Sequence, residues 1–86
     1  MPKLNYDIIR SNISEAREEL QKIESRIARN QSLDETDFQI AMQHAFHHLC
    51  FAWNIRHVAT RRYAKLSTAE FEKWGQYPKD LQFEDL

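Results

Sequence analysis

The chain has 86 residues and a mass of 10.3 kDa, which allows one small domain and leaves no room for a second core. Hydrophobic residues make up 42% of the chain and charged residues 29%, with twelve basic residues against thirteen acidic ones. This composition excludes a generally basic nucleic-acid coat and intrinsic disorder. One glycine and two prolines leave few turns, which also excludes a many-stranded sandwich or barrel.

The cysteine content and the apolar segments of the sequence indicate the cellular compartment of the protein. A single cysteine, Cys50, cannot form an internal disulfide, so nothing requires an oxidising environment. The apolar runs are too short to span a bilayer, and the first residues are not followed by the apolar segment of a secretory signal. We therefore expect a single α-helical domain over residues 1–86 that resides in the cytoplasm and does not contact a membrane.

Residues 6–30 carry the clearest periodic pattern. Apolar residues recur at alternating spacings of three and four, the heptad pattern of a helix that buries one narrow face. Asn5 precedes the pattern and is a suitable N-cap. The pattern predicts a helix over about 6–30 whose buried stripe consists of Tyr6, Ile9, Ile13, Ala16, Leu20, Ile23 and Ile27.

A second helix is predicted over about 33–66. Ser32 and Glu35 have the spacing of a capping box, and neither glycine nor proline interrupts the chain from there to Leu66. This helix would be roughly 50 Å long, against about 38 Å for the first. A short connection makes the two antiparallel, so the second should overhang the first by about seven residues. In this alignment Arg56 faces the start of the first helix, and we predict an ion pair with Asp7.

The second helix is apolar around roughly 240° of its circumference, more than one partner helix can cover. The face predicted to meet the first helix consists of Phe38, Met42, Ala45, Leu49, Ala52, Ala59 and Tyr63. Part of the remaining apolar surface must be covered by another element. Contiguous apolar surface of this kind is typical of an interface between chains.

The C-terminal part begins with a second capping box, Ser67 with Glu70, and Gly75 fits the end of a short helix over about 68–74. Residues 75–86 are expected to form an irregular tail. Its aromatic residues, together with Trp74, could dock on a partner protein. Trp74, Tyr77 and Phe83 could instead fold back over the apolar overhang of the second helix, and we favour this interpretation because that overhang otherwise lacks cover.

Two clusters could carry chemistry. His44 and His48 are four residues apart on one helix face, the spacing that lets two imidazoles share a metal. A further ligand would have to come from Glu15 or Glu19 of the first helix, or from a second chain. The other cluster is a strip of His47, Cys50, Asn54 and His57, which has the residue types of a thiol nucleophile and its base. Solvent exposure is the simpler explanation of that strip.

A third candidate is the basic end of the second helix. Arg61, Arg62 and Lys65 could bind an anion or nucleic-acid phosphates. However, basic residues at the C-terminus of a helix whose first turn is acidic also follow from the helix dipole. Acidic residues of the tail could neutralise this patch.

We therefore expect an all-α protein, an antiparallel helical hairpin with a short C-terminal helix that dimerises into a four-helix bundle. The expected function is a non-enzymatic protein–protein interaction module without a cofactor, a homodimer that binds an unidentified protein partner. Nucleic-acid or anion binding at the basic end, or metal binding by His44 and His48, are the alternatives. The predicted dimer interface consists of Ala41, His48, Phe51, Ile55 and Val58.

Overall fold

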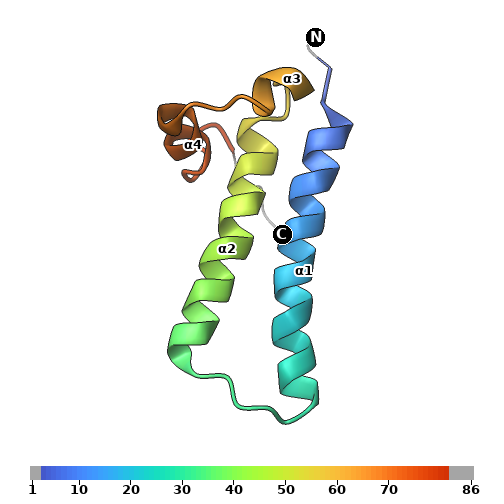
Figure 1. The fold of residues 1–86 in the computed structure, drawn as a ribbon, viewed down its shortest axis with the longest axis vertical. Coiled ribbons are helices and arrows are strands. Elements are labelled where there is room, and N and C mark those ends of the chain that lie inside the picture. The colour runs from blue at the N-terminus through green and yellow to red at the C-terminus, as the bar shows by residue number, and fades with distance from the viewer. Residues whose placement is uncertain (1–2, 82–86) are drawn as a thin grey trace.

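A computed structural model describes residues 3–81. The elements in chain order are α1 (Tyr6–Ala28), α2 (Glu35–Asn54), α3 (Thr60–Tyr63) and α4 (Thr68–Trp74). Helices α1 and α2 run antiparallel beside each other, α3 lies at one end of the pair, and α4 lies beside α2 on the side away from α1 (Figure 1). The predicted helical hairpin is therefore present, and no strand occurs within the described residues.

The helix ends follow from local capping. The Asn5 side chain accepts a hydrogen bond from the Ile8 amide at 3.3 Å, so Asn5 is the N-cap of α1 as predicted. The N-cap of α2 is Asp34, which accepts from the Asp37 amide at 2.7 Å. The prediction of Ser32 as the cap is therefore wrong by two residues, because the carboxylate of Asp34 caps the first turn instead.

The prediction of one continuous helix over 33–66 is wrong, because α2 ends at Asn54. The amide of Asn5 donates to the carbonyl of Arg56 at 2.7 Å, and the Asn5 side chain donates to the carbonyl of Val58 at 2.7 Å. These bonds bind the segment after α2 to the start of α1 and replace helical hydrogen bonds that a continuous helix would make. The chain therefore folds over the end of α1, and the predicted seven-residue overhang is absent.

This folding-over builds the core of the molecule at the end of the hairpin that lies away from the α1–α2 loop. Ile8 of α1 and Phe51 of α2 are buried there, and Ile55 is fully inaccessible to solvent. Four partly buried apolar side chains pack around these three residues. They are Val58, Tyr63, Leu66 and Trp74.

The face that α1 buries differs from the predicted stripe. Its buried residues are Ile8, Asn12, Ala16 and Ile23, whereas half or more of the predicted stripe remains exposed. The helix is rotated because the hairpin places the polar Asn12 against His48, which turns one edge of the apolar stripe away from α2. The stripe residues left exposed are Tyr6, Ile13, Leu20 and Ile27.

The C-terminal helix has the predicted bounds, and Ser67 and Glu70 form both halves of the capping box. The chain folds back onto α2. Trp74 packs against the core, and the Tyr77 ring stacks on Phe46 with centroids 6.2 Å apart. Trp74 and Tyr77 therefore do fold back onto α2, but not over the predicted overhang, which is absent. Phe83 lies outside the described part of the chain.

Candidate functional site

Three polar pairs join α1 to α2 along one edge of the hairpin, which we call the polar edge. Asn12 Oδ1 lies 3.0 Å from His48 Nδ1, and Glu19 Oε1 lies 3.1 Å from His44 Nδ1. Nearer the α1–α2 loop, Arg26 and Asp37 form an ion pair of 3.5 Å. The pairs show the register: from Asn12 to Glu19 the partner on α2 moves back by four residues, and from Glu19 to Arg26 it moves back by seven.

The opposite edge of the hairpin is apolar. At 100° per residue, Ile13 and Leu20 lie on the other side of the buried face of α1 from Glu19. On α2, Met42 and Leu49 lie on one side of the buried Ala45 and His44 lies on the other. Because the helices are antiparallel, Met42 and Leu49 are on the same edge of the hairpin as Ile13 and Leu20. The register then places three pairs at matching heights. We call this surface the apolar face; its pairs are Ile13 with Leu49, Leu20 with Met42, and Ile27 with Phe38.

The six side chains of the apolar face are between 42% and 63% exposed. A fully exposed large side chain presents on the order of 200 Å², so together they offer roughly 500 Å² of apolar surface per chain. The largest apolar patch on a typical monomer is about 300–600 Å² and is often an interaction site, and the apolar face lies in this range.

The dimer interface predicted from the sequence does not coincide with the apolar face. Phe51 and Ile55 are 2% and 0% exposed within the single chain, and Val58 packs on the same core. The expectation that these side chains are bare in a monomer is therefore wrong, because the residues after α2 cover them. Ala41 and His48 are half-buried, and His48 lies on the polar edge.

The histidines at the polar edge form a connected group. His44 Nε2 and His48 Nε2 are 3.2 Å apart, and the ring centroids are 4.8 Å apart. Burial and the nearby His44 lower the pKa of His48, whereas the carboxylates of Glu15 and Glu19 raise it. The structure thus brings together the two predicted ligands and one of the two carboxylates considered with them. Within residues 3–81, however, no group of three or more His, Cys, Asp or Glu residues is arranged to hold a metal ion.

Asn12 is the residue of this site that the sequence pattern missed. It is 2% exposed and donates through Nδ2 to the carbonyl of Ile8 at 3.1 Å. Asn12 is four residues from both Ile8 and Ala16, and this spacing places all three on one face of α1. A polar residue is not expected on a buried face, however, so the sequence pattern did not indicate it. The predicted buried face of α1 therefore followed the apolar heptad pattern.

Three of the four residues of the polar strip are buried or half-buried and not exposed to solvent; they are His47, Cys50 and Asn54. Cys50 is 3% exposed, and burial raises the pKa of its thiol, which opposes formation of a nucleophilic thiolate. His47 packs between Phe51 and Phe71, with centroids 4.7 Å and 5.0 Å away. Asn54 donates to the carbonyls of Trp74 and Gln76 at 2.7 Å and 2.9 Å. These contacts hold the tail on α2. His57, the remaining member, is exposed and contacts the Lys3 carbonyl.

The basic end of the predicted second helix is partly neutralised by α4, and the tail pairs with the preceding Arg56. Arg62 forms an ion pair with Glu70, and Arg56 pairs with Asp80 at 3.0 Å. The predicted Arg56–Asp7 pair is wrong: the backbone of Arg56 does lie at the start of α1, but its guanidinium stacks over Trp53 at 4.0 Å instead. Arg61 and Lys65 are exposed.

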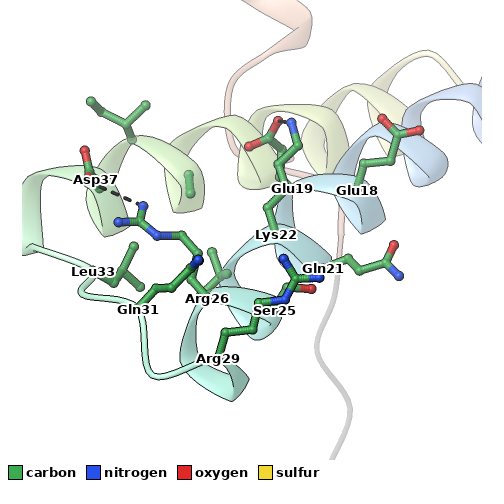
Figure 2. A pocket seen from close by; sticks show the side chains of 13 residues that line it. Glu18, Glu19, Gln21, Lys22, Ser25, Arg26, Arg29, Gln31, Leu33 and Asp37 are labelled. Atoms are coloured by element: carbon green, nitrogen blue, oxygen red, sulfur yellow. Dashed lines mark hydrogen bonds and ion pairs between the residues drawn. The ribbon is translucent and has the colours of Figure 1, made fainter.

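An open groove of about 750 Å³ lies at the loop end of the hairpin. Figure 2 shows charged side chains of both signs along it, with Arg26 directed at Asp37. Lys22 likewise lies 3.4 Å from Glu19. The charges that line this groove are thus of both signs and in part already paired, so they do not indicate a ligand of one sign.

No protein-family model, no curated protein and no solved structure matches this chain. Among the described helices, none combines the length and the apolar character needed to cross a membrane.

Proposed function

We propose that this chain is a non-enzymatic helical interaction module that acts as a homodimer, in which two hairpins pack their apolar faces together into a four-helix bundle. The observation that carries the proposal is the open apolar face with its three matched pairs. In the proposed four-helix bundle each of these pairs would form half of one layer of the core, and the same pair of the second hairpin would form the other half. An unidentified protein partner would bind the outer surface of this dimer.

A two-fold axis parallel to the helices suits this surface. It places α1 of one chain against α2 of the other at the same height, so that Ile13 and Leu49 of one chain meet Leu49 and Ile13 of its partner. Residues Leu20 and Met42 form the middle layer in the same way. The surface is thus complementary to itself, which a two-fold interface requires.

The available area also suits a second copy. Two apolar faces of roughly 500 Å² each would bury roughly 1,000 Å² on association, which is the lower bound for a specific interface. The hydrophobic gain from this burial is partly offset by the freedom that the two chains lose on association, and the small stability expected of a hairpin of this length makes even a modest surplus significant. Association would therefore stabilise the fold as well as form the dimer.

The test is sedimentation equilibrium of the full chain at tens of micromolar. We expect twice the mass of one chain for the unmodified protein. Leu20→Glu places a charge in the middle layer and should give single chains or unfolded protein. Gln21→Glu, the adjacent exposed position outside the apolar face, should leave the dimer intact.

Two results would contradict the proposal. One is a mass of a single chain for the unmodified protein across this concentration range. The other is a dimer that Leu20→Glu leaves intact with an unchanged association constant, because the interface would then lie elsewhere. Met42→Glu, on the other helix of the same layer, checks that the effect belongs to the layer and not to α1 alone.

A further inference from the structure

The hydrogen bonds at the polar edge determine where the protons of two histidines lie. The Asn12 amide nitrogen donates to the carbonyl of Ile8 at 3.1 Å, so its oxygen is the atom that faces His48 Nδ1 at 3.0 Å. This oxygen only accepts, and therefore His48 carries its proton on Nδ1. The Glu19 carboxylate likewise accepts from His44 Nδ1 at 3.1 Å.

When both rings are neutral, each presents an unprotonated Nε2, and these two atoms lie 3.2 Å apart. Two nitrogen lone pairs this close repel each other unless a proton or a metal ion lies between them. A metal ion at 2.0–2.1 Å from each nitrogen, the usual zinc–imidazole distance, would see the pair at an angle of roughly 100°. This angle is close to the tetrahedral value that zinc prefers.

Each ring has an oxygen acceptor behind it. The Glu19 carboxylate lies 3.1 Å from His44 Nδ1, and the Asn12 amide oxygen lies 3.0 Å from His48 Nδ1. Glu19 also has the place of an outer partner, a carboxylate that accepts from the Nδ1 of a ligating histidine. The amide oxygen of Asn12 accepts in the same way from Nδ1 of His48. Such partners fix the ring orientation and increase the basicity of the ligand.

We propose that His44 and His48 bind a divalent ion of the zinc, nickel and copper class through their Nε2 atoms, with Glu19 and Asn12 as positioning residues. The side chain of His44 is 48% exposed, so water completes the coordination. Imidazole ligands suit these late transition metals better than magnesium or calcium, which prefer oxygen. Two protein ligands make this a weak, exchangeable site and not a structural zinc centre.

The site is independent of the proposed dimer. It lies on the polar edge, and the apolar face is on the other side of the hairpin. Loss of dimerisation would therefore leave metal binding in place, and loss of metal binding would leave the dimer in place.

The experiment is calorimetric titration of zinc and copper into untagged full-length protein that has been stripped with a chelator and dialysed at neutral pH. We expect one ion per chain, micromolar binding, and tighter binding of copper than zinc. His44→Gln should abolish saturable binding, and the matched change His57→Gln should not alter it. Glu19→Gln should weaken binding about tenfold, the lower end for loss of an outer partner, without removing it.

A second measurement reads the ligands directly. In long-range nitrogen–proton spectra of the imidazoles, zinc should shift the Nε2 resonances of His44 and His48 and leave those of His57 unchanged. The proposal is overturned if the unmodified protein shows no saturable binding at millimolar metal. It is equally overturned if His44→Gln binds as tightly as the unmodified protein, or if the shifted resonances belong to other histidines.

Discussion

The buried amide of Asn12 accepts a hydrogen bond from the ring of His48 across the two helices, with 3.0 Å between Oδ1 and Nδ1. Asn12 is 2% exposed, and its nitrogen is held by the Ile8 carbonyl. This pair sets the rotation of α1 against α2. It also orients the His48 ring toward His44, so one buried polar contact links the architecture to the proposed metal site.

Removing this contact should destabilise the fold. Asn12→Ala leaves His48 Nδ1 without a partner and opens space beside Ile8, and we expect a loss of about 1–3 kcal/mol in the free energy of unfolding. Urea denaturation measures it. Ser11→Ala, at the neighbouring exposed position, is the control and should change little. Equal stability of the two variants would show that the pair does not hold the helices in register.

Asn54→Asp should release the tail from α2. The amide nitrogen of Asn54 donates to the carbonyls of Trp74 and Gln76, and a carboxylate would instead face two acceptors. We expect a cost of about 1–3 kcal/mol. The readout is the reaction of the buried Cys50 thiol with a disulfide reagent, which should accelerate in the variant.

The control for that experiment is Gln43→Glu, the corresponding amide-to-acid change at an exposed position of α2. It should leave the thiol as slow as in the unmodified protein. On the sequence pattern alone Asn54 belongs to a solvent-facing strip, and its substitution would be harmless. Unchanged thiol reactivity in Asn54→Asp would support that pattern and contradict the structure.

Gly75→Ala should also weaken tail docking, through packing and not through backbone strain. Gly75 has φ −84°, which any residue adopts, but an added Cβ would lie 2.5 Å from Cε1 of His47. That ring is held between Phe51 and Phe71 and has little room to move. We expect a loss of about 1–3 kcal/mol, as for other overpacked sites. Thermal unfolding followed by tryptophan fluorescence measures it, and Gln76→Ala, a truncation at an exposed side chain, is the comparison.

The stability should fall as the pH drops below the ordinary histidine value of about 6.5. Burial, and then the charges of His48 and His44, lower the pKa of His47, and burial with His44 lowers that of His48. The unfolded chain therefore binds protons at a higher pH than the folded one does. The free energy of unfolding is at its full value above this range and decreases as the pH falls toward the lowered pKa values.

Urea denaturation at about pH 7.5 and about pH 5, with chelator present, measures this effect. The carboxyl groups of Glu70 and Asp80 have lowered pKa values because of hydrogen bonds from Ser67 and Trp53, so they stay ionised over this interval. His47→Gln should reduce the pH dependence. A protein that is as stable at the lower pH as at the higher one would refute the prediction.

The local features of the fold could be predicted from the sequence because they depend on neighbouring residues. Asn5 as a cap, the capping box of Ser67 with Glu70, and the bounds of α4 all rest on contacts within one helical turn. The antiparallel hairpin follows from a short connection between two long amphipathic segments. The spacing of His44 and His48, with a carboxylate needed from the first helix, also follows from helix geometry.

The remaining features were decided by contacts between residues far apart in the chain. Helix α2 ends at Asn54 without a glycine or proline because Asn5 binds the backbone that follows, and this contact buries Ile55 and Phe51 in the chain's own core. The contact of Asn12 with His48 turns α1 so that Asn12 is buried beside Ala16 and Ile23, whereas the other edge of the heptad stripe stays exposed. A periodic pattern shows which residues share a helix face, but the partner that covers the face depends on competition among all the elements for the same apolar surface.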